Sequence, residues 1–202
     1  MPKVKLTKTA LKQERDSLKQ FQRFLPTLQL KKQQLQLEMR TCLERIESNK
    51  QREAQVKNAL NGWLLLFGTD AIPARIGEIL KIGEIVTGLQ NIAGVNVPVF
   101  EQVLFEGSGT DLYLDDPWLD DAVEAVKNII SIRSEREIIR KQYDLIEAEL
   151  RVTTQRVNLF EKVMIPECKE NIRKIQIYIG DQNTAAVARS KIAKKKLQET
   201  VA

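Results

Sequence analysis

An apolar stripe with a seven-residue period runs through the last third of the chain and restricts that part to a long helix packed on another helix. The stripe, with Lys, Arg, Glu and Gln between its members, is Ile138-Ile139, Leu145-Ile146, Val152 and Leu159-Phe160. This is the period of a helix that buries one narrow face, whereas the side chains of a strand alternate. From Trp118 to Lys196 the sequence holds one proline and one glycine, Pro166 and Gly180. At roughly 1.5 Å per residue a nearly unbroken helix here is on the order of 100 Å long, so it needs a second long helix beside it.

The first sixty residues supply that second helix, because apolar residues occupy two heptad positions along them. We predict that the seam between the two arms contains Leu11, Leu18, Phe21, Leu28 and Leu35 from the first arm and Ile138, Leu145, Val152 and Leu159 from the second. Lys32, Asn49 and Glu53 interrupt the pattern, and such interruptions usually lower stability and fix register. Pro26 predicts a local kink or break that costs about 3 kcal/mol unless packing compensates.

The heptad pattern stops near Asn61-Gly62, and a different kind of sequence follows. Residues 69–80 have the cap and first-turn proline of a short helix. Ile82–Leu89 and Val95–Phe105 are rich in Val and Ile, so they predict a β-hairpin whose connection is residues 90–94. An isolated hairpin is marginal in water, and we therefore expect it to pack on the helices or on a partner.

These patterns together predict a fold dominated by α-helix. Its main part is a long antiparallel two-helix coiled coil, and a small central insert contains a short helix and a β-hairpin. The three parts of this one elongated unit are residues 1–62, 63–117 and 118–202. Antiparallel arms bring both termini to one end, where the longer second arm continues as a single helix.

The net charge of +5 conceals a strong charge pattern along the chain. Residues 1–60 carry +8, residues 61–126 carry −9 and residues 127–202 carry +6. The end that holds both termini is basic, with Lys3, Lys5, Lys8, Lys12, Arg189, Lys191, Lys194, Lys195 and Lys196. Crowded like charges repel on a lone helix pair, and we therefore predict that these residues contact a partner.

The composition argues against a catalytic or metal-binding site in this chain. Histidine is absent, which removes the commonest general base and the commonest transition-metal ligand. Cys42 and Cys168 are too far apart for metal-ligand spacing, and we expect both to be reduced thiols near the seam. The aspartates between residues 111 and 121 fit a helix N-terminus better than a cation site. We predict no catalytic residue, cofactor or metal, and the lack of a secretion signal predicts a reducing compartment.

Four stretches distributed over the chain carry a resemblance to a known family. They are Leu6-Thr7-Lys8-Thr9-Ala10-Leu11; Ala93-Gly94-Val95-Asn96-Val97-Pro98; Arg156-Val157-Asn158-Leu159-Phe160-Glu161 with Ile165-Pro166; and Arg189 through Leu197. In this order and spacing the chain resembles the D subunits, the central-stalk rotor family of V-type and archaeal-type rotary ATPases. Pro26 departs from the family pattern and puts the straightness of the first arm in doubt.

The resemblance implies a non-catalytic axle that transmits torque in ATP-driven ion (proton) transport or ATP synthesis. The implied partners are the catalytic and regulatory subunits of the ATPase hexamer, the small central-stalk subunit and the socket subunit of the membrane ion-translocating ring. Neither nucleic acid nor direct membrane insertion is implied. The implied location is cytoplasmic, peripheral to the membrane as part of the complex.

Three other functions fit parts of the pattern: a coiled-coil scaffold, a prefoldin-like holdase chaperone, and RNA binding by the basic arms. A holdase needs exposed apolar residues at the tips of its arms, where this chain has lysines. RNA binding is disfavoured because aromatics make up only 5% of the residues and the acidic middle repels phosphate.

Overall fold

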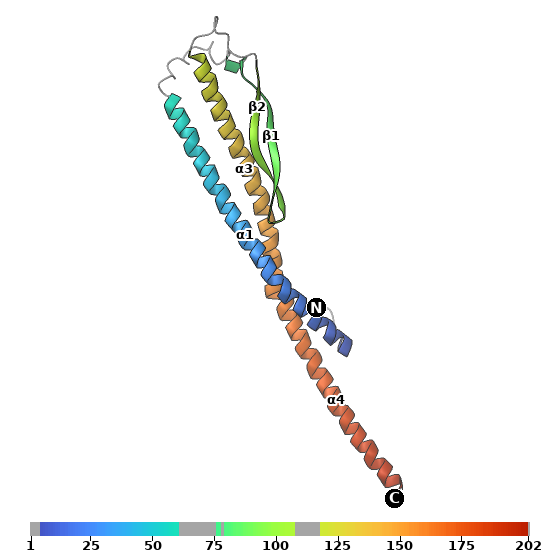
Figure 1. Ribbon diagram of the computed structural model, residues 1–202. Helices are drawn as coiled ribbons and strands as arrows, with labels where there is room; N and C mark the ends of the chain where they lie inside the picture. The colour runs from blue at the N-terminus through green and yellow to red at the C-terminus, as the bar shows by residue number, and fades with distance from the viewer. Residues whose placement is uncertain (1–4, 61–75, 78, 108–117, 202) are drawn as a thin grey trace. The chain divides into compact units, whose positions relative to one another are not determined.

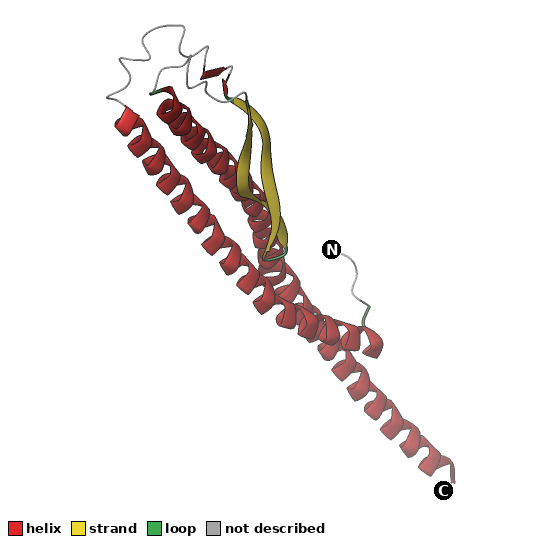
Figure 2. Ribbon diagram, turned by 45° about the horizontal axis from the view of Figure 1, so that its top comes forward, coloured by secondary structure: helices red, strands yellow, loops and turns green. Residues whose placement is uncertain are grey.

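The fold is known from a computed structural model that describes residues 5–60, 76–77, 79–107 and 118–201. In chain order the elements are α1 (Lys8–Leu60), β1 (Lys81–Ile92), β2 (Val95–Glu106), α3 (Leu119–Leu159), the π-helix η2 (Phe160–Met164) and α4 (Ile165–Val201) (Figure 1). Long helices from both ends of the chain dominate, and the strands form one antiparallel hairpin (Figure 2). The predicted fold class is therefore confirmed.

The chain divides into two compact units, each of which pairs a segment of α1 with a segment of the second arm. The hairpin unit is residues 33–151, and the terminal unit is residues 1–32 together with residues 152–202.

The hairpin unit has a core to which both helices and the hairpin contribute. Its central cluster contains Leu35 and Cys42 from α1, Val97 from β2, and Ile139 and Ile146 from α3. Fully burying one such aliphatic side chain is worth about 1.5–3 kcal/mol. The hairpin therefore packs on the helices, which is how a two-stranded sheet gains stability in water.

A second cluster of the hairpin unit lies at the start of α3, where Ile76 and Ile79 pack against Leu119 and Val123. Ile76, Gly77 and Ile79 are helical, in agreement with the short helix predicted to end at Leu80. The remainder of that predicted helix falls on residues 69–75 and 78, outside the described residues.

The hairpin turn is tighter than predicted, because β1 and β2 leave only Ala93 and Gly94 between them. Both turn residues have positive φ, 50° and 82°, as a two-residue type I′ turn requires. Asn91 stabilises the turn, since its Oδ1 accepts a hydrogen bond from the Gly94 N–H at 3.0 Å and its Nδ2 donates to Asn96 Oδ1 at 2.6 Å. The expectation of a five-residue connection is wrong because alanine is an unusual residue at a positive-φ position.

The terminal unit is a helix pair without a hairpin. Its buried side chains include Thr153, Val157, Cys168 and Ile175. The ring of Phe21 stacks on that of Phe160, with centroids 5.2 Å apart. Near the start of α1, Glu14 Oε1 accepts a hydrogen bond from Asn171 Nδ2 at 3.3 Å, so these two residues lie opposite each other in the antiparallel pair.

Both prolines of the arms lie within continuous helix. The α1 helix runs through Pro26 from Lys8 to Leu60, so Pro26 does not break it. Pro166 is the second residue of α4 and follows the π-helical turn of η2, in which the Ile165 N–H bonds to the Phe160 carbonyl. A π-turn widens the helix by one residue and is a common cause of local irregularity. The second arm is thus helical throughout, as predicted, with one wide turn.

The buried stripe of the second arm lies one residue later than the predicted seam. Leu35 and Ile138 are buried, and Leu11, Leu18, Phe21 and Leu28 are half-buried. However, Leu145, Val152 and Leu159 are 44%, 38% and 48% exposed, while Ile146 and Thr153 are buried. Successive residues are turned by about 100° around a helix. Where two adjacent residues are both apolar, the sequence alone therefore does not decide which of them is buried. Thr153 and Gln142 take buried positions although they are polar, and the side chain of Gln142 donates to the Pro98 carbonyl.

Candidate interaction surfaces

The last part of α4 is uncovered. Every side chain from Asp181 to Gln198 is exposed, and we name this segment the helix end. The cause is the register of the terminal unit, in which Glu14 lies beside Asn171. The α1 helix begins six residues before Glu14, at Lys8, so its first turn lies opposite residues near 177, and α4 continues beyond it (Figure 1).

The basic residues form two sets that the structure does not bring together. Lys3 lies outside the described residues, and all the others are exposed: Lys5, Lys8, Lys12, Arg189, Lys191, Lys194, Lys195 and Lys196. Arg189 lies about 27 Å along α4 from Asn171, at about 1.5 Å per residue. For the described basic residues, the expectation that they lie together at one end is therefore wrong, because the second arm is much longer than the first.

Apolar side chains are exposed on the helix end between the basic ones. Val187, Ile192 and Leu197 are 54%, 58% and 66% exposed. They are five residues apart, so each is turned by about 140° from the one before it. Three apolar groups that point in different directions cannot all be covered by one partner helix. A surface that surrounds the helix end can cover them all.

An ionic layer joins α1 to α3 inside the hairpin unit. The Glu53 carboxylate is only 6% exposed. It accepts hydrogen bonds from Lys57 at 2.8 Å, from Arg133 Nε at 2.9 Å and from Arg136. Hydrogen bonds from Lys57, Arg136 and Arg133, in that order, lower the pKa of Glu53 to about 2. Beside it, Arg52 forms a 2.7 Å salt bridge with Glu135.

The ionic layer makes one alignment of α1 and α3 more stable than the alignments shifted from it by a helical turn. A shift of one helical turn would leave the Glu53 carboxylate buried without its arginines, which is costly. The sequence predicts Asn49 and Glu53 as interruptions of the seam, but it misses the partners that Glu53 has on the other arm. A signal was present, because Arg133 and Arg136 are three residues apart and so share a helix face.

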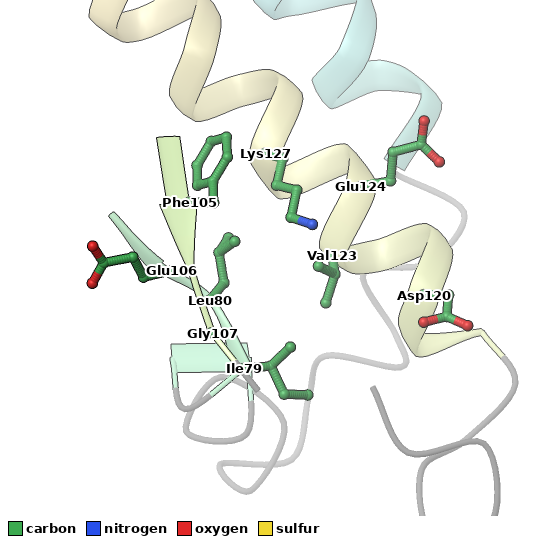
Figure 3. Close-up of a pocket in the computed structure, with 9 residues that line it drawn as sticks. All are labelled: Ile79, Leu80, Phe105, Glu106, Gly107, Asp120, Val123, Glu124 and Lys127. Carbon is green, nitrogen blue, oxygen red and sulfur yellow. The ribbon is translucent and has the colours of Figure 1, made fainter. Parts of the chain in front are cut away.

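A hollow of about 380 Å³ lies where the hairpin meets the start of α3 (Figure 3). Lys127 Nζ lies 6.0 Å from the centroid of the Phe105 ring, whereas the carboxylates of Glu106 and Glu124 point away from each other (Figure 3). Within the described ranges, no group of three His, Cys, Asp or Glu side chains is placed to hold a metal ion. The described side chains that line this hollow do not converge as the polar groups of a chemical site do.

The aspartate cluster of the sequence falls partly outside the described residues, which resume at Trp118. Asp120 and Asp121 lie in the first turn of α3, where the helix dipole favours negative charge.

None of the described helices is long and apolar enough to cross a membrane.

Cys42 and Cys168 are buried free thiols, so both are packed as predicted, and their reduced state in solution stays a prediction. Burial raises the pKa of Cys42. Burial, followed by the hydrogen bond with Glu14, raises the pKa of Cys168 to about 11. Since the thiolate is the reactive form, both cysteines serve as packing residues in this fold.

Comparison with known proteins identifies relatives over nearly the full chain. Residues 10–195 match the family model of the ATP synthase D subunit. The V-type ATP synthase D subunit of Borreliella burgdorferi is 45% identical over 197 residues, which cover 98% of this chain and 96% of that protein. The V-type ATP synthase D subunits of Chlamydia felis and Chlamydia trachomatis serovar A are 33% and 32% identical, over 97% of this chain and 94% and 97% of theirs. The resemblance seen in four short stretches is thus confirmed.

Proposed function

The chain belongs to the ATP synthase D-subunit family, and we propose that it is the non-catalytic axle of a V-type rotary ATPase. In this role it transmits torque between the catalytic hexamer and the ion-translocating ring of the membrane. Its partners are the catalytic and regulatory subunits of the hexamer, the small central-stalk subunit and the socket subunit of the ring. It is associated with the membrane peripherally, through those partners.

The observation that carries this proposal is the helix end. Most of the stability of a helix in a protein comes from packing of its apolar face, which the helix end lacks, and its apolar residues point to several sides. The bore of a ring of subunits is a surface that surrounds a helix and covers all of these side chains. A coiled-coil scaffold that packs side by side with a partner helix would leave part of them exposed.

The basic residues of the helix end suit an acidic or carbonyl-rich lining of that bore. Exposed charges contribute weakly one at a time and are screened over about 10 Å at 0.1 M salt. Their summed field nevertheless steers a charged rod toward an oppositely charged channel. We therefore assign the apolar side chains to holding the helix end and the lysines to guiding and orienting it.

Torque requires no chemistry from this chain. Each angle of an asymmetric axle contacts the surrounding subunits differently, and so favours one conformation at each nucleotide site over the others. This coupling is reciprocal, because a change of conformation at a nucleotide site then favours a new angle of the axle.

The test is to assemble the hexamer with variants of the full chain and to measure assembly and ATP hydrolysis. Deletion of residues 189–202 should weaken assembly or coupling while circular dichroism shows that the rest remains helical. Native mass measurement should find one copy of the intact chain per hexamer. A truncated chain that assembles and couples like the full chain, at both low and high salt, would contradict the proposal.

Two matched sets of substitutions separate the roles of the two kinds of side chain. Changing Val187, Ile192 and Leu197 together to Ser should weaken assembly at all salt concentrations, because apolar contact is lost. Changing Lys191, Lys194 and Lys195 together to Gln should slow association mainly at low salt, where charges are least screened.

A further inference from the structure

The two edges of the hairpin differ in their contacts with the helices, because β2 packs on α3 and β1 lies farther from it. On β2, Pro98 has no N–H to offer, and its carbonyl accepts a hydrogen bond from the side chain of Gln142 on α3. The neighbouring Val97 is fully buried in the helix core. The outer edge of β2 is thus closed, and β1 lies on the side of the hairpin away from α3 (Figure 1).

No described residue forms a further strand on the outer edge of β1, and we call this edge the open edge. In a two-residue hairpin the pair that flanks the turn exchanges hydrogen bonds, and every second pair does so along the ladder. By the observed register this leaves Asn91, Leu89 and Thr87 with their N–H and C=O groups directed away from β2. The position of Pro98 agrees with this assignment, because it faces Leu89 and a proline is tolerated only where no ladder N–H is needed.

Proteins usually protect such an edge with Lys, Pro or a cover of helix or loop. From Ile82 to Ile92 this strand has neither a proline nor a basic residue. Instead it exposes apolar side chains, with Leu89 82% and Ile82 56% exposed. An open edge with exposed apolar side chains is the surface to which an added strand binds.

The charge of the hairpin specifies what kind of strand fits. Residues 81–106 contain three glutamates, Glu84, Glu101 and Glu106, and one basic residue, Lys81, and all four side chains are exposed. This net charge of −2 contrasts with the +5 of the whole chain. The hairpin is therefore complementary to a basic segment.

Two glycines of β1 bring those carboxylates toward the open edge. A Cβ on Gly88 would lie 2.5 Å from Oε1 of Glu101, and one on Gly83 would lie 3.0 Å from the side chain of Glu106. The glutamate side chains of β2 therefore reach across β1 in the space that side chains would otherwise fill. Glu101 is moreover the extra residue of a bulge between the Val86 and Thr87 pairs, and bulges re-aim side chains.

We propose that the open edge of β1 binds an extended segment of a partner protein in which basic and apolar residues alternate, so that the hairpin becomes a three-stranded sheet. Main-chain hydrogen bonds to Thr87, Leu89 and Asn91 hold the added strand, and the glutamates select its basic side chains. A second copy of this chain is a poor occupant, because its own glutamates would face these. The inference does not depend on the axle function.

The test uses the full isotope-labelled chain and a short capped peptide that alternates valine and lysine. Bound peptide should slow hydrogen exchange about tenfold at the amides of Thr87, Leu89 and Asn91. The amides of Gln90 and Gly88, which already bond to β2, should change little. The same peptide with glutamate in place of lysine, or with N-methyl groups on alternate residues, should have no such effect.

Substitutions in the chain complete the test. Leu89→Pro removes an outward N–H without removing a bond to β2, so it should abolish binding, whereas Leu89→Ala keeps the N–H and should weaken binding only partly. Peptide binding by Leu89→Pro equal to that by Leu89→Ala would overturn the proposal. Equal binding of the lysine, glutamate and N-methylated peptides by the unaltered chain would overturn it as well, even if Leu89→Pro disturbed the hairpin. Dimerisation of the chain through β1 without peptide would also contradict it.

Discussion

The hairpin unit and the terminal unit both pair a segment of α1 with a segment of the second arm, but different interactions stabilise them. The hairpin unit has three elements around one core and an ionic layer in which Glu53 holds two arginines and a lysine. The terminal unit has two elements, a ring stack and a few buried side chains, and then a helix end without any cover. Interactions within the chain stabilise the first, whereas part of the second has no cover within the chain, and we propose that a partner covers it.

This difference follows from how much apolar surface each segment can bury. A helix pair buries one narrow stripe, and a hairpin laid on the pair buries a second one. A single helix buries nothing, and in water it is marginal unless something binds it. Stability within this chain should therefore fall from the hairpin unit to the helix end.

The largest expected effect is on the ionic layer of the hairpin unit. Glu53→Gln leaves Arg136 without its carboxylate, and we expect the free energy of unfolding to fall by about 3 kcal/mol, at the low end for breaking a buried pair. The matched control is Glu47→Gln on the same helix, whose salt bridge to Lys50 is exposed. That change should cost less than about 0.5 kcal/mol. Urea unfolding of both variants measures the difference. Equal effects would show that the ionic layer stabilises the hairpin unit no more than an exposed ion pair does.

The same carboxylate makes the stability of the hairpin unit depend on pH. The folded-state pKa of Glu53 is lowered from 4.5 to about 2, so its contribution is present above the unfolded pKa. As pH falls from about 4.5 towards 2, the unfolded chain takes up the proton first, and the contribution is progressively lost. Unfolding measured between these pH values should therefore show a steeper loss of stability for the unaltered chain than for Glu53→Gln. Parallel curves would contradict the assignment.

A glycine in the hairpin unit should tolerate substitution poorly. A Cβ on Gly107 would lie 1.6 Å from the carbonyl oxygen of Ile79, so backbone must move to admit it. We expect Gly107→Ala to lower the free energy of unfolding by about 2 kcal/mol, as overpacking typically does. Loss of amide protection confined to residues near 79 and 107 is the signature to measure. An unchanged stability would show that the contact is not tight.

The smallest expected effect has the opposite sign and lies in the terminal unit. A Cβ on Gly180 would meet nothing within 4 Å, and alanine is favoured over glycine in an exposed helix by up to about 1 kcal/mol. Gly180→Ala should therefore raise the helicity of α4 and slow amide exchange around residue 180. Destabilisation by this change would mean that Gly180 serves a contact that the isolated chain lacks.

Periodic features were predicted well because they repeat. The stripe from Ile138 to Phe160 predicts a long helix, and the Val- and Ile-rich segments predict the hairpin. The sequence does not decide between Leu145 and Ile146 as the buried residue, because either one continues an apolar stripe. The hairpin packs against α3 through Val97 and Gln142, and this contact between distant segments has no local signal.

Contacts between the arms were harder to predict than the arms themselves. Glu53 was recognised as a break in the seam, but its pairing with Arg133 and Arg136 depends on the register. The register also places Glu14 beside Asn171 and so separates the basic residues of the two termini. The lysines of the helix end argue against a holdase, yet Val187 and Leu197 are exposed among them. The family match and the exposed apolar residues of the helix end, rather than its charge, favour the axle.

The central claim is that the helix end is completed by a surrounding partner, whereas the core of the hairpin unit is complete by itself. Residue-resolved hydrogen exchange, on the free chain and on the chain assembled with the catalytic hexamer, tests it directly. In the free chain, amides from Asp181 to Gln198 should exchange rapidly, and those around Leu35 and Ile146 slowly. In the assembly the helix end should become protected on all faces, while the core of the hairpin unit changes little. Equal exchange of the helix end in both states would contradict the account.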